Sequence, residues 1–229
     1  MISGETRLVG LLGDPVSHSL SPLMQNAAFA VRGLDWAYVP LPVRSTELEA
    51  AVRGLVALGF AGANVTTPHK LTIARLVETE APSVNTLVIA GGKVLGYSTD
   101  AAILGELEFE RVAIIGDGGA AAAFAAALPE APRFSRRGTW PPDVARVDLV
   151  VNATSVRDEV VVEVGAGQAL VDLPYPRSAT AHAAESAGAR VVDGLDVLAA
   201  QGAASFELWT GLPAPVDVMR GVLRNPPLT

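Results

Sequence analysis

The stretch Asn64-Val65-Thr66-Thr67-Pro68-His69-Lys70 offers acid–base chemistry through its lysine. Lys70 and Lys93 are the only lysines among 17 basic residues, so arginine is the usual surface cation of this chain. A lysine amine can lose its proton near neutral pH where its surroundings favour the neutral form, whereas an arginine cannot. Lys93 follows Gly91-Gly92, which is typical of a solvated turn. Lys70 is therefore a candidate proton donor or acceptor; a surface lysine at a helix start is the alternative.

The residues around Lys70 predict where it lies in the fold. Phe60 to Val65 has the apolar pattern of a buried strand, and Pro68 suits the first turn of a following helix, where its missing N–H costs nothing. The lysine is thus expected near a helix start at the carboxyl end of a strand. Proteins of the α/β class place their ligands at this edge of a sheet.

A glycine-rich segment, Gly116-Asp117-Gly118-Gly119-Ala120-Ala121, follows the apolar run Val112 to Ile115 and opens a helical pattern. It fits the dinucleotide-binding pattern G-x-G-x-x-(G/A). Gly116 allows the tight turn, Gly118 lets the backbone approach a pyrophosphate, and the small Ala121 keeps the helix close to the sheet. We predict that Gly116, Gly118, Gly119 and Ala120 bind a nucleotide; glycines that serve only the turn are the alternative.

The next strand bears on the choice of cofactor. An NAD site expects an acidic residue about 20 positions after the first glycine, to hold the ribose 2′-hydroxyl. That position is Arg136 (136 − 116 = 20), between Ser135 and Arg137. Two guanidinium groups can hold a 2′-phosphate, so the sequence favours NADP; two solvated arginines are the alternative. Asp117 would oppose a pyrophosphate unless its carboxylate points away.

Strands and helices are predicted to alternate along most of the chain. Strands are expected at 7–13, 37–43, 60–65, 84–90, 94–97, 112–115, 133–135, 147–151, 169–172 and 190–192. Helices are expected at 23–31, 46–58, 99–107, 120–128, 179–187, 195–209 and 215–223. Ser21 is predicted to cap the first helix, Leu58 to be buried by the second, and Gly91-Gly92 to join a hairpin.

Composition narrows the class of protein. Half of the 229 residues are hydrophobic, enough for a substantial core, and the net charge of −7 argues against nucleic acid or an anionic membrane as partner. There is no cysteine, and the three histidines have no metal-ligand spacing, so no metal site is predicted. No apolar run reaches the ~18 residues of a membrane helix, and the first residues lack a signal-peptide pattern. We expect a cytoplasmic protein that acts on a small molecule.

Several ordered stretches together resemble the shikimate dehydrogenase family over nearly the whole chain. Besides the Lys70 stretch and the glycine loop, they are 13–22, 84–87, 98–100, 152–155, 172–175 and 193–206. The resemblance implies an α/β protein of two lobes, an N-terminal substrate-binding domain and a Rossmann-type doubly wound dinucleotide-binding domain. It also implies reversible, NADPH-dependent reduction of 3-dehydroshikimate to shikimate in the aromatic precursor pathway.

The resemblance also implies roles for individual residues. Lys70 and Asp100 look like the catalytic pair. The positions that match substrate-binding residues are Ser19, Ser21, Asn64, Thr66, Asn85, Tyr175 and Gln201. Asn152, Ala153, Thr154 and Gly194 match the cofactor side, together with the glycine loop and Ser135-Arg136-Arg137. Ser19 and Ser21 would hold the substrate carboxylate, because alternate residues of an extended segment point the same way.

Two departures from the family pattern affect rate and substrate choice more than fold. This chain has Ser98-Thr99-Asp100-Ala101 where the family usually has Asn-Thr-Asp-Gly, so the backbone after Asp100 loses the freedom of glycine. The segments between Lys70 and Asn85 and after Arg137 are shorter than usual.

The expected domains are residues 1–100 with 210–229 for substrate and 101–209 for NADP, the latter with linking helices at both ends. The protein is expected to be a monomer or homodimer. Two alternatives stay open: an NAD-dependent quinate or aminoshikimate dehydrogenase, and a cofactor-binding homologue without catalysis.

Overall fold

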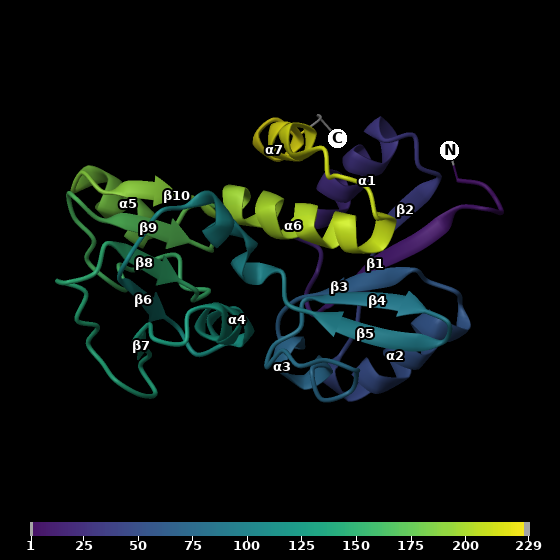
Figure 1. Cartoon of the computed structure of the whole chain (residues 1–229), viewed down its shortest axis with the longest axis horizontal. Helices are drawn as coiled ribbons and strands as arrows, with labels where there is room; N and C mark the ends of the chain where they lie inside the picture. Colours follow the sequence, from purple (N-terminus) through teal and green to yellow (C-terminus); the bar gives the residue numbers. More distant parts are fainter. Residues whose placement is uncertain (1, 227–229) are drawn as a thin grey trace. The chain divides into compact units, whose positions relative to one another are not determined.

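The computed structural model describes residues 2–226, which form two compact units. The chain passes from one unit to the other between Thr99 and Asp100 and returns between Leu198 and Ala199. The divisions predicted from the sequence follow residues 100 and 209. The second one lies inside helix α6 (Gly194–Thr210), which contributes residues to both units. Each unit has its own five-stranded sheet (Figure 1).

The first unit contains a mixed sheet with the strand order β2-β1-β3-β4-β5. Its strands are β1 (Arg7–Gly13), β2 (Trp36–Pro42), β3 (Gly62–Val65), β4 (Thr86–Ala90) and β5 (Lys93–Tyr97). The first three are parallel, and β4 and β5 form the predicted hairpin. Gly91 and Gly92 both have positive φ (58° and 78°), as a two-residue hairpin turn requires.

Helices pack beside this sheet and bury an apolar core. They are α1 (Ser21–Val31), α2 (Leu48–Ala57), α3 (Lys70–Ile73), α7 (Val216–Arg224) and the second half of α6, with a 3₁₀ turn η1 (Ser45–Glu47) before α2. Val52 and Leu55 of α2 are buried with Leu12 and Val65 of the sheet. Leu58 was expected to join them, but α2 ends at Ala57 and its side chain is 74 % exposed.

The second unit contains an entirely parallel sheet with the order β10-β9-β8-β6-β7. Its strands are β6 (Val112–Ile115), β7 (Arg133–Phe134), β8 (Leu149–Asn152), β9 (Ala169–Asp172) and β10 (Arg190–Val192). Its helices are α4 (Gly119–Ala127), α5 (Ala179–Ser186) and the first residues of α6, preceded by the 3₁₀ segment η2 (Asp100–Glu106). The strand order reverses after β7, as in doubly wound dinucleotide-binding folds.

Two crossovers of this sheet contain no helix: residues 135–148, between β7 and β8, and residues 153–168, between β8 and β9. Doubly wound sheets normally cover both faces with helices. Here the irregular segments cover the sheet with buried valines, among them Val144, Val161 and Val162, which pack on Ile115 and Val150. The shortening predicted after Arg137 falls in the first of these crossovers.

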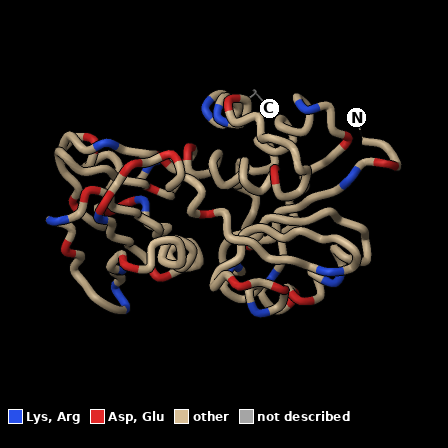
Figure 2. The backbone as a smooth tube through the Cα atoms, viewed as in Figure 1, with Lys and Arg blue, Asp and Glu red and all other residues tan. Residues whose placement is uncertain are grey.

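Acidic and basic residues are interspersed over both units in the described part of the chain (Figure 2). No helix within residues 2–226 combines the length and the hydrophobicity needed to span a membrane.

Candidate functional site

The carboxyl ends of β1 and β3 bring two loops of the first unit together. The strands are parallel neighbours, with Leu12 opposite Val65, and the amide of Thr66 donates to the Leu12 carbonyl at 2.8 Å. A Cβ added at Gly13 would clash with the side-chain methyl of Thr66. Glycine at position 13 therefore lets Thr66, a predicted substrate-binding residue, lie directly against the loop that follows β1.

Lys70 begins α3 at this same edge of the sheet. The amide of His69 donates to the Thr66 carbonyl at 2.9 Å, which makes a turn of residues 66–69. Pro68 lies in that turn and not in the helix, contrary to the prediction. His69 is buried, and its Nε2–H donates to the Val43 carbonyl at 2.6 Å. These contacts fix the backbone from which the half-buried Lys70 side chain extends.

A buried polar cluster lies beside the end of β3. Asn64 is 4 % exposed, and its Oδ1 accepts a hydrogen bond from the Tyr38 hydroxyl at 2.9 Å. Its Nδ2 lies 2.9 Å from the Asn85 carbonyl and 3.0 Å from the Ser205 hydroxyl. The cluster also includes the hydroxyls of Thr86 and Thr99. The amide of Asn64 is thus used inside the first unit, where it joins β3, β4 and α6.

Asn85 connects this cluster to the residue that precedes Asp100. Its Oδ1 accepts from the Thr99 amide at 2.6 Å, and its Nδ2 donates to the Thr99 hydroxyl at 2.9 Å and to Gln201 Oε1 at 3.2 Å. Because β4 runs antiparallel to β3, Asn85 lies at the same sheet edge as Asn64. Asp100 follows Thr99 directly, begins η2 and is 6 % exposed.

The two candidate serines lie in a turn and not in an extended segment. The Ser19 amide donates to the Val16 carbonyl at 3.1 Å, and α1 begins at Ser21. The predicted capping role of Ser21 is wrong: Leu20 occupies the N-cap position, and the Ser19 hydroxyl accepts from the Ser21 amide at 3.2 Å. Ser19 therefore fixes the start of α1, and Ser21 is 5 % exposed in its first turn.

The glycine loop of the second unit has the geometry that its sequence predicts. Gly116 has φ of 130°, and a Cβ at this position would lie 3.0 Å from the Ala153 carbonyl oxygen. Gly118 is the N-cap of α4, whose amides begin at Gly119. Ala121 is fully buried and lies beside Gly116, so a small residue is needed there. The loop leaves the first amides of a nine-residue helix available to an anion.

The arginines after β7 each contact a carboxylate. Arg136 Nη2 lies 2.6 Å from Glu159 Oε1, and its guanidinium carbon is 5.6 Å from the centre of the Trp140 ring. Arg137 Nε lies 3.7 Å from Asp117 Oδ2. Both arginines are mainly exposed. Asp117, an unfavourable neighbour for a pyrophosphate, thus has a basic partner in the adjacent loop.

Asn152 and Thr154 belong to a buried chain of hydrogen bonds at the carboxyl ends of β8 and β9. Asn152 Nδ2 donates to Asp172 Oδ1 at 2.7 Å, while its Oδ1 accepts from the Thr154 hydroxyl at 2.8 Å. Asp172 is fully buried. Burial raises the pKa of the Asp172 carboxyl, although hydrogen bonds from Asn152 and Ser178 oppose the shift. The Asn152 side chain therefore contacts protein and not solvent.

Tyr175 and Gly194 lie on the segments that follow β9 and β10. Tyr175 is half-buried, and the peptide bond between Tyr175 and Pro176 is cis. A Cβ at Gly194 would lie 2.5 Å from the carbonyl oxygens of both Leu173 and Pro174. Glycine is thus needed for the start of α6 to approach the segment after β9.

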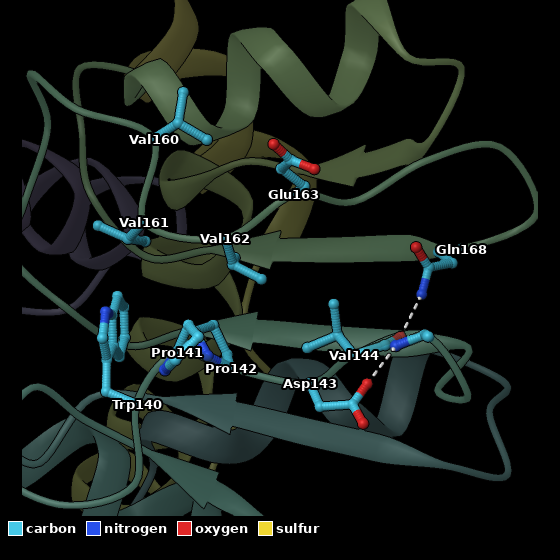
Figure 3. A pocket seen from close by; sticks show the side chains of 11 residues that line it. Trp140, Pro141, Pro142, Asp143, Val144, Val160, Val161, Val162, Glu163 and Gln168 are labelled. Atoms are coloured by element: carbon cyan, nitrogen blue, oxygen red, sulfur yellow. Dashed lines mark hydrogen bonds between the residues drawn. The ribbon is translucent and has the colours of Figure 1, made fainter.

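A cavity of about 540 Å³ opens between the two irregular crossovers of the second unit (Figure 3). It is lined by residues 140–145 and 160–163 and by Gln168. Gln168 Nε2 donates to the carbonyls of Val144 and Val147, which ties the two crossovers together. None of the predicted site residues lines this cavity.

Sequence reasoning missed several polar residues that hold the predicted ones in place. They are Tyr38, Thr86, Thr99, Ser205, Glu159 and Asp172. Asp172 stands in a stretch that carried the family resemblance, which was a usable signal. Ser205, Thr86 and Thr99 also stand in such stretches, whereas Tyr38 and Glu159 lie outside them and gave no signal. Within residues 2–226, no group of three or more acidic or histidine side chains could hold a metal ion.

Comparisons with known proteins match both ends of the chain to one family. A model of the shikimate dehydrogenase substrate binding domain matches residues 11–87, and a model of the shikimate 5′-dehydrogenase C-terminal domain matches residues 194–224. A shikimate dehydrogenase (NADP(+)) of Moorella thermoacetica is 40 % identical, covering 98 % of this chain and 95 % of the relative. One from an Anaeromyxobacter species is 38 % identical over 99 % of both chains.

Solved structures agree with these relatives. A shikimate dehydrogenase of Aquifex aeolicus superposes with a TM-score of 0.88 at 29 % identity, over 98 % of this chain and all of the other. The enzyme of Thermus thermophilus in complex with NADP(H) and shikimate gives a TM-score of 0.83 at 27 % identity, over 96 % and 99 % of the two chains. The Moorella alignment spans 279 positions against 229 residues here, so this chain is shortened relative to that protein.

Proposed function

Since the chain belongs to the shikimate dehydrogenase family, we propose that it is an NADP-dependent oxidoreductase that reversibly reduces 3-dehydroshikimate to shikimate. The observation that carries this proposal is the near full-length identity of 40 % with an NADP-dependent shikimate dehydrogenase. The expected NADP-binding and substrate-binding elements support it from each unit separately.

The glycine loop and the arginines fit NADP. The positive φ of Gly116 and the exposed start of α4 suit a pyrophosphate, and Arg136 suits a 2′-phosphate. Gly118, Gly119, Ala120, Ser135, Arg137, Ala153, Thr154 and Gly194 complete the proposed cofactor site. NADPH, when bound, supplies the hydride, and the protein must orient the substrate and move one proton.

The proton is proposed to move at Lys70 Nζ. Reduction of the ring carbonyl adds a hydride to carbon and a proton to oxygen, and a protonated Lys70 donates that proton as the alkoxide develops. In the reverse direction the neutral amine accepts the hydroxyl proton. Asp100 is proposed as its acidic partner, as the family resemblance implies for the catalytic pair.

The substrate is proposed to bind at the sheet edge of the first unit. Ser19 and Ser21 would hold the carboxylate, and Thr66 and Gln201 would contact the ring hydroxyls. Asn64 and Asn85 act there through the buried cluster that fixes Gln201 and Thr99. Tyr175 is proposed to line the site. A monomer or homodimer, a cytoplasmic location and the domain boundaries stay predictions.

The test mixes purified protein with shikimate and either NADP⁺ or NAD⁺ and follows formation of the reduced nicotinamide. Reduction of NADP⁺ that depends on shikimate is the expected result. Quinate replaces shikimate in a parallel assay, which tests the alternative substrate. Efficient turnover of quinate with NAD⁺, and none of shikimate with NADP⁺, would overturn the proposal.

A further inference from the structure

Asp172 has no place in the chemistry described above, yet its carboxylate is fully buried beside the proposed cofactor site. Asn152 and Asp172 end neighbouring parallel strands, directly opposite each other in register. The carboxyl edge of a doubly wound sheet is where dinucleotides bind. A buried carboxylate is costly unless it is satisfied, and here it accepts from Asn152 Nδ2 at 2.7 Å and from the Ser178 amide at 3.4 Å.

The carboxylate determines which way the Asn152 amide faces. A carboxylate can only accept hydrogen bonds, so the NH₂ group of Asn152 must face Asp172. The carbonyl Oδ1 then faces Thr154, where it accepts from the amide at 3.2 Å and from the hydroxyl at 2.8 Å. With the amide turned round, an oxygen would face the carboxylate and an NH₂ would face the Thr154 N–H. Asp172 therefore selects the only orientation that satisfies both neighbours.

The segment held in this way packs against the glycine loop. The Ala153 amide donates to the Ile115 carbonyl at 2.8 Å, and the Ala153 carbonyl is the atom closest to where a Cβ on Gly116 would lie. The Thr154 hydroxyl also accepts from the Val156 amide at 3.3 Å, which extends the order along the loop. A change in the orientation of Asn152 would be transmitted to the backbone next to the first glycine.

We propose that Asp172 is a positioning residue for NADP binding, which acts through the Asn152 amide to set the backbone of residues 153–156 beside the glycine loop. This inference rests on the proposed function, because it takes that loop as the cofactor site. Asp172 itself does not contact the cofactor in this proposal.

The test exchanges the two side chains. Asp172→Asn removes the carboxylate that orients Asn152, and Asn152→Asp places two carboxylates against each other. In the double variant, the carboxylate now at position 152 accepts from Thr154 and from the amide group now at position 172. The oxygen of that amide group accepts from the Ser178 amide. The hydrogen bonds with Thr154 and the Ser178 amide and the bond between positions 152 and 172 can therefore form again. Affinity for NADPH is measured by titration, with KM for shikimate and a circular dichroism spectrum for each variant.

Each single variant is expected to bind NADPH about tenfold more weakly, because a buried hydrogen-bonding partner is lost. KM for shikimate is expected to change less than about twofold, and the double variant to bind NADPH within about threefold of the original protein. Folded single variants with unchanged NADPH affinity, or a folded double variant no better than the singles, would overturn the proposal.

Two further variants keep the test decisive. Asp148→Asn is the control: Asp148 accepts hydrogen bonds from two backbone amides, those of Glu110 and Arg111, at the opposite end of β8. It is expected to leave NADPH affinity unchanged, and an equal loss there would mean that the effect is only structural. Thr154→Val provides the test if the double variant does not fold. It keeps the Asp172–Asn152 pair and is expected to weaken NADPH binding; unchanged affinity would refute the proposal. Failure of the original protein to bind NADPH would instead refute the proposed function.

Discussion

Arg136 and Glu159 form an ion pair between the two irregular crossovers of the second unit, with 2.6 Å between guanidinium nitrogen and carboxylate oxygen. Their side chains are 57 % and 51 % exposed, and Trp140 lies against the guanidinium. Arg136, the residue proposed to bind the 2′-phosphate of NADP, is therefore already paired with a carboxylate of its own chain. A phosphate at this position would compete with Glu159 for the same cation.

The first prediction concerns cofactor choice. Arg136→Ala is expected to weaken NADP binding by about 10- to 100-fold, because a hydrogen bond to a charged group is worth about 1.5–3 kcal/mol. NAD lacks the 2′-phosphate, so its affinity is expected to change less than about threefold. Titration of both cofactors measures the effect, with the exposed Arg146→Ala as control. Equal losses for NADP and NAD would refute a phosphate contact at Arg136.

The second prediction concerns Glu159, the partner of Arg136, and expects the opposite effect on NADP affinity. Glu159→Gln removes the carboxylate that competes with the 2′-phosphate, and exposed ion pairs are worth about 0.2–1 kcal/mol. NADP affinity is therefore expected to rise by up to about fivefold, while NAD affinity stays constant. Glu163→Gln, a nearby exposed residue that lines the cavity of Figure 3, serves as control. A fall in NADP affinity would mean that Glu159 supports Arg136 instead of competing for it.

The sequence predicted all ten strands of the described residues to within two residues at each end, because their signals are local. β1, β6, β9 and β10 are short apolar runs bounded by turn residues, and their bounds were predicted without error. The glycine loop was also predictable, since the tight turn at Gly116 follows from a local pattern. Local patterns failed at helix ends: Leu58 continued the apolar period of α2 past the point where the backbone leaves the helix.

The polar cluster of the first unit could not have been predicted from local patterns. Asn64, Thr99 and Ser205 are far apart in sequence and meet only because β3, the end of the β5 segment and α6 converge. The orientation of an amide such as that of Asn152 depends on an acceptor 20 residues away in a neighbouring strand. The resemblance identified Asn64 and Asn152 among these positions. It did not identify Thr99, Ser205 or Asp172, whose contacts with them depend on the fold.

The third prediction tests the proposed proton donor against a matched lysine. Lys70→Ala is expected to lower turnover by ~10²–10⁴, with a modest change in shikimate affinity, because general acid–base catalysis contributes that much. Lys93→Ala removes an exposed lysine that lies 3.7 Å from Glu78, and it is expected to leave turnover unchanged. Steady-state kinetics with NADP⁺ and shikimate measure both variants. Full turnover by Lys70→Ala would remove this lysine from the chemistry.

The fourth prediction follows from two carboxylates at opposite ends of β8 and β9. Burial raises the pKa of Asp172, so between 3.8 and its raised pKa the folded protein binds more protons than the unfolded chain, and stability falls as pH rises. Burial opposes the shift at Asp148, but hydrogen bonds from the Glu110 and Arg111 amides lower its pKa, so its contribution is lost as pH falls below 3.8. The free energy of unfolding is measured with denaturant on both sides of pH 3.8 for the original protein, Asp172→Asn and Asp148→Asn. The difference between the original protein and each variant is plotted against pH. The Asp172 difference should change with the opposite slope to the Asp148 difference. Slopes of the same sign would contradict the buried environment assigned to Asp172.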